Sequence, residues 1–594
     1  MEHLRLFIAI GLSLLIFIVW NFFFVDKKKD TLPQETIKAE QLAKKAPETQ
    51  EKLATVTAPS LKETPSEQIK PSKTITVNSP LYTVKISEKG AVFKSFVLKN
   101  YKETINVDSP LLDMISPDLT GGTVRVGFAD DSLHGFNGAV FSAHLEKDTL
   151  DIKNEPQEIS FSWTSPQGVV VEKKYLFSPE TYMIGLNIIV KNDSNQTIKD
   201  SLILSLFRSM SEKETRYGFE GPSALINNKL KQVKIKKIKK QNIFQGDIKW
   251  IAVQDRYFMS SIVPDAPVAA SMRLSFNDDN ILENEYVQPE FVINSGDQHA
   301  LKYMLFFGPK SMKVLKSVDY DLVKAVNFGM FDILAKPCVW IMDFIYDHFI
   351  PNYGVAIIML TIFTKVILWP LGSKSYKSMA DMKKIQPLMA EIKEKYKGDK
   401  KKMNEEMMGL YKTYKVNPMG GCLPMVVQIP VFFALYRMLY EAIELRHAPF
   451  FWWMNDLSAP DRLFRFDFAV PFMEPPYGIP VLTIIMGATM FFQQKMSPPM
   501  GDPTQAKMMM MMPIVFTFIF INFSSGLVLY WLVNNVPRKN SNTMLFLTDR
   551  PGFSVWLEPR RRVSGSPYQN PPRRRLSTKN QIQKKIAAVP PIKP

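Results

Sequence analysis

Five apolar segments follow one another in the second half of this chain, and they restrict its possible folds more than any other feature. They cover residues 353–371, 419–439, 479–492, 508–523 and 526–536. A helix of about 20 apolar residues spans the roughly 30 Å hydrocarbon core of a bilayer, and the first two segments reach that length. The last three are short for a complete span. The series predicts a helical protein that crosses a membrane several times.

A further apolar stretch lies at residues 6–25, where only Ser13 and Asn21 are polar. A cleaved signal peptide has a shorter apolar region of about 7–15 residues, followed by small residues. This stretch runs instead into the charged sequence DKKKD. We expect residues 1–25 to form an uncleaved transmembrane anchor rather than a signal peptide. Residues 26–74 contain no aromatic side chain and are predicted to be a disordered tether, because they cannot bury enough apolar surface to offset chain entropy.

Short alternating runs separated by turn residues characterise residues 75–310. Val171, Lys173, Tyr175 and Phe177 alternate in one such run, and the turn pair Asn192-Asp193 (192–193) ends the next. Alternation with period two is typical of strands that bury one face. A region of this length built in this way predicts a large all-β sandwich.

The segment 319–350 has apolar residues at helical spacing, but it is interrupted by Pro337 and by charges that recur from Asp321 to Asp347. The charges are too frequent for a span. We therefore expect an amphipathic helix that lies along the membrane surface.

Lysine and arginine counts in the loops predict the topology. Residues 374–416 carry 12 basic side chains and the tail 537–594 carries 13, whereas the loop 440–478 carries three basic and six acidic side chains. Basic loops remain in the cytoplasm, so the β domain, one span earlier, is expected outside. These two basic segments, with net charges of +6 and +11, account for the whole net charge of +17.

Residues 374–416 are predicted to form a helical hairpin with its turn at 397–399. One face of the first helix carries Met382, Ile385 and Met389, and the second carries Met407, Leu410 and Tyr414. The simple interpretation is a solvated hairpin with basic outer faces. The alternative is an adaptable methionine-rich surface that meets varied apolar clients or a partner bearing RNA.

Lys365 lies inside the first of the five segments. A lysine within a spanning helix is costly, by about 2.5–3.5 kcal/mol at the helix centre, and is a candidate functional residue; the alternative is that it extends to the nearby membrane surface. Thr361 lies one helical turn away, so the two share a face. The later segments add further polar residues with which they are expected to line a wet intramembrane cavity: Gln428, Asn522, Tyr530, Asn534 and Asn535.

Signals for catalysis or metal binding are weak. The two cysteines, Cys338 and Cys422, are too few for a disulfide framework, and the six histidines are scattered. No phosphate-binding glycine loop or nucleophile motif is visible, and the run 508–512 of five methionines is interpreted as packing rather than as a copper site. We therefore expect no enzyme activity, no cofactor and no metal. A small-solute transporter or channel, and a membrane-anchored carbohydrate-binding protein, remain alternatives.

Four motifs in the second half of the chain resemble those of a known protein family. They are LYKTYKVNPMGGCLPMVVQIPVFFALYRML at 410–439, HAPFFWWMNDLSAPD at 447–461, MFFQQKMSP at 490–498 and SSGLVLYW at 524–531. Their order and spacing resemble the YidC/Oxa/Alb family. The anchor, the tether and the β region, with WIAVQDRYFM at 250–259, are similar to the larger form found in Gram-negative bacteria.

The resemblance implies a membrane protein insertase and chaperone of the inner membrane. It implies a fold with an N-terminal anchor, a five-helix insertase core at 351–536 and a periplasmic β domain, with the N-terminus in the cytoplasm. The implied partners are hydrophobic client proteins, the Sec translocon, membrane lipids, and the ribosome and targeting factors through the hairpin and tail; DNA is not among them. The implied client groove opens to cytoplasm and lipid and holds one positive residue. Here that residue is Lys365, with Thr361, Gln428, Tyr530, Trp531 and Asn534 beside it.

The chain departs from the family pattern after Val536. Pro537 and three polar residues interrupt the last segment, and a proline- and arginine-rich sequence without periodicity follows. We therefore expect residues 537–594 to be a basic, disordered and atypical tail, and its sequence resembles an out-of-frame reading or an unrelated graft more than an insertase tail.

Overall fold

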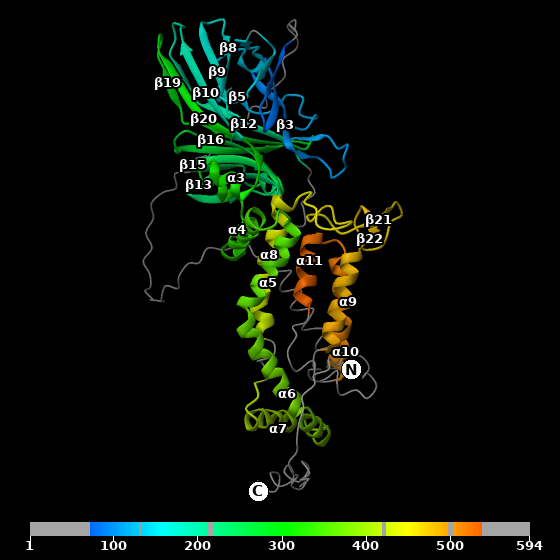
Figure 1. The fold of residues 1–594 in the computed structure, drawn as a ribbon. Coiled ribbons are helices and arrows are strands. Elements are labelled where there is room, and N and C mark those ends of the chain that lie inside the picture. Colours follow the sequence, from blue (N-terminus) through cyan, green and yellow to red (C-terminus); the bar gives the residue numbers. More distant parts are fainter. Residues whose placement is uncertain are drawn as a thin grey trace, which may run out of the picture. The chain divides into compact units, whose positions relative to one another are not determined.

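The computed structural model describes residues 72–130, 132–145, 147–210, 218–417, 423–496 and 503–536. The predicted anchor (1–25) and tail (537–594) lie outside the described residues, as does almost all of the predicted tether (26–74). The described chain consists of a β domain followed by a helical region (Figure 1).

Twenty strands, one short α-helix and one 3₁₀ helix, η1 Phe136–Gly138, form the described β domain. Their bounds are β1 Thr74–Asn78, β2 Tyr82–Ser87, β3 Val92–Lys102, β4 Leu111–Asp113, β5 Arg125–Phe128, β6 Ser142–Ala143, β7 Thr149–Asp151, β8 Gln157–Thr164, β9 Val169–Phe177, β10 Met183–Asn192, β11 Ile198–Asp200, β12 Leu202–Ser209, β13 Gly221–Ile226, β14 Lys229–Gln232, α2 Ile235–Ile238, β15 Ile243–Gln254, β16 Phe258–Pro264, β17 Val268–Phe276, β18 Ile281–Val287, β19 Phe291–Ile293 and β20 Gln298–Pro309.

Two sheets dominate this domain. The larger has 13 strands, in which β10 lies between β9 and β20, and the smaller has five strands in the order β4-β3-β2-β1-β7. Strands β10 and β20 are antiparallel, with Ile188 opposite Leu301. The only parallel pair among the described strands is β1 with β7.

Aromatic side chains pack between the two sheets. Phe93 and Phe96 on β3 lie 5.6 Å and 5.0 Å, ring centroid to centroid, from Phe307 on β20. The alternation predicted for β9 places Val171, Tyr175 and the other odd-numbered residues inward, where they are fully buried. Burial of large apolar side chains from both sheets is the main term that stabilises such a domain.

Lys173 is an exception within this apolar layer, because it occupies an inward position of β9. Its side chain is 1% exposed, and Nζ donates to the Gly90 carbonyl oxygen at 2.7 Å and lies 4.8 Å from the centroid of the Phe141 ring. Burial lowers the pKa of Lys173 to about 7. The group is therefore half protonated near neutral pH, whereas in an unfolded chain it remains charged until about pH 10.

This burial predicts a pH-dependent stability. Between pH 7 and about 10 the unfolded chain binds a proton that the folded chain releases, so the free energy of unfolding of the β domain should rise with pH, by about 1.4 kcal/mol per unit from this group. Lys173→Met should remove this rise. Hydrogen–deuterium exchange of β9 and β10 amides in the full chain, corrected for intrinsic rates, measures the effect. The same rise in Lys173→Met would assign it to another group.

In the described part of the chain, the helical region contains nine α-helices, three short 3₁₀ helices and one small β-hairpin. Their bounds are α3 Met312–Ser317, η2 Leu322–Ala325, η3 Gly329–Phe331, α4 Asp332–His348, α5 Tyr353–Ile367, α6 Trp369–Lys395, α7 Lys400–Thr413, α8 Leu423–Glu441, η5 Ile443–Leu445, β21 Leu463–Phe466, β22 Tyr477–Ile479, α9 Val481–Met496, α10 Pro503–Phe520 and α11 Ser525–Asn535. Taken singly, none of the described helices combines the length and the apolar character of a complete span; the pair α5 and α6, bent by 58° at the break, meets both criteria together.

Helix α4 occupies the segment expected at the membrane surface. One face, with Ala335, Val339, Met342 and Ile345, is buried. The other face leaves Ile333 and Trp340 exposed at 86% and 59%. Exposed apolar side chains on a helix that also carries Asp332 and Lys336, an ion pair at 2.6 Å, are typical of a helix at an interface.

The hairpin is formed by α6 and α7, and α6 begins at Trp369, before the predicted start at 374. Between the two helices, Ile385 and Met389 are buried, and Met407 and Leu410 pack against them. Tyr414, expected on this packed face, is 53% exposed, and Tyr411 packs there instead. The difference arises because α7 ends at Thr413, so Tyr414 no longer follows the helical period.

Candidate functional site

The predicted polar site begins on α5. Asn352 caps this helix, because its side chain accepts a hydrogen bond from the Val355 amide at 3.1 Å. Thr361 is fully buried, and its hydroxyl donates to the Ile357 carbonyl oxygen at 2.6 Å. The structure therefore places Thr361 inside the helix packing, with its own polar group satisfied along α5.

Lys365 lies one turn further along α5 and reaches the end of α11. Its Nζ donates to the carbonyl oxygens of Val533 at 2.9 Å and Val536 at 3.3 Å. Lys365 is only partly buried. A cation at the C-terminus of a helix satisfies carbonyls that have no partner within the helix and is favoured by the helix dipole. The structure thus gives Lys365 an observable contact on a second helix of the predicted groove.

Close packing of α5 and α11 depends on Gly526. A Cβ atom at this position would lie 3.0 Å from the Leu457 carbonyl oxygen and 3.3 Å from Cδ1 of Ile357. Both distances are tighter than ordinary van der Waals contact, so a larger residue would push α11 away from α5.

Tyr530 and Gln428 join α11 to α8. The side chain of Tyr530 is 3% exposed, and its hydroxyl is hydrogen-bonded to Gln428, which is partly buried. Asn534 is partly exposed one turn beyond Tyr530. The neighbouring Asn535 is 6% exposed, and its Nδ2 has no hydrogen-bond partner within the described ranges. These four side chains place hydrogen-bonding groups on facing helices.

Trp531 has mainly packing contacts. Its ring lies 4.8 Å from that of Phe432 and 5.1 Å from that of Phe520, centroid to centroid, and Nε1 donates to the sulfur of Met490 at 3.2 Å. The tryptophan thereby connects α8, α9 and α10. A partly buried indole of this kind contributes chiefly by its large apolar area.

Asn522, expected in the same cavity, lies elsewhere. Its Oδ1 accepts from Arg462 at 3.2 Å and from the Glu474 amide at 2.9 Å. Arg462, 9% exposed, also donates to the carbonyl oxygens of Pro476 and Ile521. In the topology prediction, Arg462 counted only as one of the three basic residues of the loop 440–478. The guanidinium instead fixes the loop between α8 and α9, and no local sequence pattern indicates these partners.

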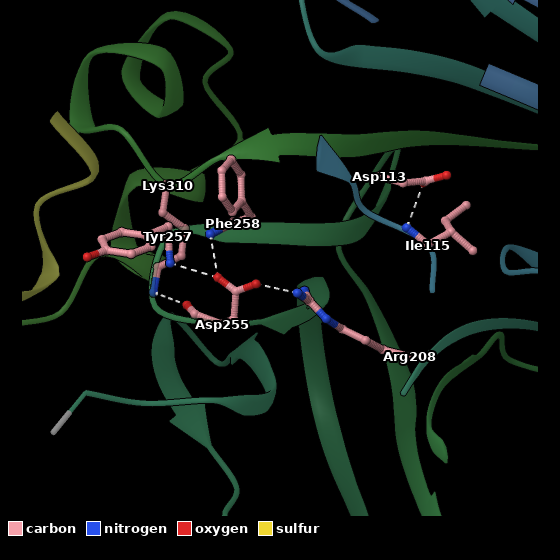
Figure 2. Close-up of polar contacts among 7 residues, drawn as sticks. All are labelled: Asp113, Ile115, Arg208, Asp255, Tyr257, Phe258 and Lys310. Carbon is pink, nitrogen blue, oxygen red and sulfur yellow. Dashed lines mark hydrogen bonds and ion pairs between the residues drawn. The ribbon is translucent and has the colours of Figure 1, made fainter. Parts of the chain in front are cut away.

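A second charge cluster, partly buried, lies at the turn between β15 and β16 (Figure 2). The Asp255 carboxylate accepts hydrogen bonds from the amides of Tyr257 and Phe258, both at 2.7 Å, and pairs with Arg208. Nζ of Lys310 donates to the Asp255 carbonyl oxygen at 2.9 Å. Burial raises the pKa of Asp255, but Arg208, the two amides and Lys310 outweigh burial and hold the pKa below its ordinary value.

The next residue, Arg256, contacts the helical region. Its Nε donates to the Tyr440 carbonyl oxygen at 2.6 Å, and the guanidinium lies 3.6 Å from the centroid of the Tyr440 ring. Arg446 contributes a reciprocal contact by donating to the Lys102 carbonyl oxygen at 2.6 Å. The sequence WIAVQDRYFM therefore supplies both this partly buried carboxylate and an arginine that joins the two regions. The sequence alone did not predict the role of the arginine.

Two protein families match this chain. The family described as YidC periplasmic domain matches residues 74–341, and the family described as 60Kd inner membrane protein matches residues 344–544. The second match continues past Val536, where the sequence departs from the expected pattern. Within the described part of the chain, no group of three or more His, Cys, Asp or Glu side chains could hold a metal ion.

Curated relatives cover most of the chain. A membrane protein insertase YidC of Syntrophobacter fumaroxidans is 42% identical over 77% of this chain and 84% of its own length. One from Pelobacter propionicus is 38% identical over 90% of this chain and 97% of its own. A crystal structure described as an active YidC insertase with the first transmembrane domain resolved has 19% identity and a TM-score of 0.34, covering 81% of this chain and 94% of that one.

The predicted fold class, a large β periplasmic domain with a helical insertase region, is confirmed. Relatives of this identity and coverage show a membrane protein insertase, so the transporter and carbohydrate-binding alternatives no longer apply. This chain belongs to the YidC family of membrane protein insertases, which insert proteins of the inner membrane and are not enzymes.

Proposed function

We propose that client segments enter the membrane along a groove formed by α5, α8 and α11. The residues that would meet a client are Lys365, Thr361, Gln428, Tyr530, Trp531 and Asn534. The observation that carries the proposal is the contact of Lys365 with the end of α11, because it places a cation between two helices whose facing side chains are polar. An acidic residue of the client that leaves water would then meet this cation, whereas without the groove it would meet hydrocarbon.

Short helices support the same route. Helix α9 has 16 residues and α11 has 11, which correspond to about 24 Å and about 17 Å at 1.5 Å per residue. The hydrocarbon core is about 30 Å thick, so a bilayer next to these helices would become thinner. A hydrophilic client segment would then cross a shorter apolar distance. Partitioning of the client's apolar segment into lipid drives the step, without nucleotide or covalent chemistry.

The proposed topology follows the charge distribution. The hairpin α6–α7 and the basic tail lie in the cytoplasm with the N-terminus, the β domain lies in the periplasm, and α4 lies on the periplasmic membrane surface. The apolar side chains that α4 leaves exposed support this position. The hairpin and tail would meet the ribosome and targeting factors, and the insertase would act alone or with the Sec translocon.

The lysine-rich helices α6 and α7 carry methionines both in their small core and on their surface, and this supports the role proposed for the hairpin. Met408 is 53% exposed on α7, and Met389 lies within the small hairpin core. Methionine side chains accommodate varied apolar partners.

Client crosslinking tests the groove. A photo-crosslinking residue at Gln428 or Asn534 should capture a client during insertion, whereas the same residue at Phe518, 59% exposed on α10, should not. The chain is expressed in an insertase-depleted Gram-negative strain, whose growth it should restore. Equal capture from Phe518 and Gln428 would contradict a groove in which clients meet α8 and α11.

A further inference from the structure

A lysine-rich segment of the β domain has no role in the client groove. Between Gly221 and Gly246 there are seven lysines and no acidic residue. All seven lysines are exposed: Lys229, Lys231, Lys234, Lys236, Lys237, Lys239 and Lys240. The apolar residues between them, including Val233 and Ile238, are buried at 4% and 5% exposure and hold the segment on the domain. We refer to residues 229–240 as the lysine segment.

Next to these lysines the surface is hollow. An open depression of about 450 Å³ lies over β14 and the start of β15, and its lining includes Lys229, Lys231 and Ile243. Ile243 is 49% exposed, and Nζ of Lys231 lies 4.9 Å from the centroid of the Phe244 ring. Cationic and apolar groups therefore share one surface, as an amphiphilic ligand requires.

The lysine segment is connected to the chain that leads into α4. The turn between β13 and β14 ends at Asn228, and its Oδ1 accepts a hydrogen bond from Nζ of Lys324 on η2 at 3.1 Å. Asp321 pairs with Lys324 at 3.1 Å and with Lys249 of β15 at 2.6 Å. These contacts hold the β13–β14 turn beside η2, which is followed by η3 and α4.

Helix α4 and η3, which follow η2 in the chain, leave several apolar side chains exposed. Met330, Ile333, Trp340 and Phe344 are exposed at 81%, 86%, 59% and 41%. On α4, positions 333, 340 and 344 share a face, opposite the buried face that includes Val339 and Met342. A helix with an apolar exposed face that includes tryptophan is suited to the boundary between headgroups and acyl chains.

From these observations we propose that the lysine segment binds the anionic headgroups of phospholipids in the periplasmic leaflet of the inner membrane. The proposal uses the membrane position of α4 given under Proposed function, but not the groove. A lysine ammonium is a compact cation on a flexible stem, and several of them attract an anionic lipid surface without a shaped pocket. An acidic protein segment is the competing partner, but it would not explain the exposed apolar face of α4, the helix that follows η2 and η3 in the chain.

Quenching by lipid headgroups tests this proposal in the full chain. Cys338 and Cys422 are replaced by Ser, and a fluorophore is attached to Gln241→Cys. The chain is reconstituted into phosphatidylcholine bilayers with or without phosphatidylglycerol, each with headgroup spin-labelled lipid. Quenching should be stronger in the anionic bilayer and should fall to the zwitterionic level in high salt, because salt screens the charges.

The variant that removes four charges is K236Q/K237Q/K239Q/K240Q, and in anionic bilayers its quenching should also fall to the zwitterionic level. The matched control K85Q/K99Q/K153Q/K302Q removes four exposed lysines from other parts of the β domain and should retain the full effect. Thermal unfolding shows whether each variant is folded. Lys365→Ala should leave the quenching unchanged, so failure of the groove and failure of this proposal are distinguishable.

Four results would overturn the proposal. The first is equal quenching in both bilayers. The second is an equal loss in the control variant, since it would assign the effect to net charge alone. The third is displacement by inorganic phosphate that exceeds displacement by sodium chloride of equal ionic strength, since it would assign the lysines to a free anion. Crosslinking of position 241 to an acidic protein with equal yield in both bilayers would likewise favour the competing partner.

Discussion

Lys365→Ala is expected to lower the insertion rate of clients with acidic translocated segments by about tenfold or more. A hydrogen bond to a charged group contributes about 1.5–3 kcal/mol, and 1.4 kcal/mol corresponds to a factor of ten. Lys365→Arg keeps the charge and should retain most of the activity, although its planar fork meets Val533 and Val536 differently. Insertion is measured by protease accessibility of a client in insertase-depleted cells that express each variant.

Two controls separate the charge from the structural contact. Lys365→Met keeps much of the side-chain volume without the charge and should resemble Lys365→Ala. Ile362→Ala removes an apolar side chain that is 52% exposed on the same helix and should have little effect. Membrane levels of each variant report assembly. Unchanged insertion with Lys365→Ala, or an equal loss for clients with neutral translocated segments, would show that the cation does not act on client charge.

Asp255→Ala is expected to destabilise the β domain by about 1–3 kcal/mol, because it leaves the partly buried donors that Asp255 now satisfies without an acceptor. The variant would leave Arg208 without its carboxylate and the amides of Tyr257 and Phe258 without their acceptor. Hydrogen–deuterium exchange of β15 and β16 in the full chain measures the loss.

Asp247→Ala is the matched control, because Asp247 is exposed on the same strand and its replacement should change stability by no more than about 0.5 kcal/mol. The pKa of Asp255 is lower when folded, so its contribution is present above the unfolded pKa and is lost as pH falls through the folded value. The difference between wild type and Asp255→Ala should therefore shrink in acid. A constant difference at all pH values would mean that the carboxylate contributes without its charge.

The β domain illustrates what periodicity predicts well. Alternation along β9 correctly placed Tyr175 and Phe177 inward, and it placed Lys173 with them, since position within a strand sets the direction of a side chain whatever its polarity. Which strands pair was not predictable, because β10 lies between β9 and β20, and β20 begins more than a hundred residues later. Such pairing depends on packing between distant segments.

The polar site was predictable only where helical period and burial agree. Lys365 and Thr361 stand out as polar residues in an apolar helix, and the helical period places them one turn apart. Asn522 has the same local signature but lies in the loop with Arg462, because a guanidinium from a distant segment provides its partner. Asp255 belongs to a run that reads as an ordinary strand and turn, so its burial beside Arg208 follows from tertiary structure alone.

The junction of α5 and α6 consists of Leu368 alone, with φ −83° and ψ 0°, and the helices bend by 58° there. A flexible linker of several residues would let the α6–α7 hairpin move without effect on α5. Leu368 has only two rotatable backbone angles, and it is hydrogen-bonded to both helices, since its amide donates to the Thr364 carbonyl oxygen and its carbonyl oxygen accepts from the Gly372 amide, each at 3.0 Å. A swing of α6 therefore strains the last turn of α5, which carries Lys365. The orientation of Lys365 is thus sensitive to any movement of the α6–α7 hairpin that changes the backbone conformation of a single leucine.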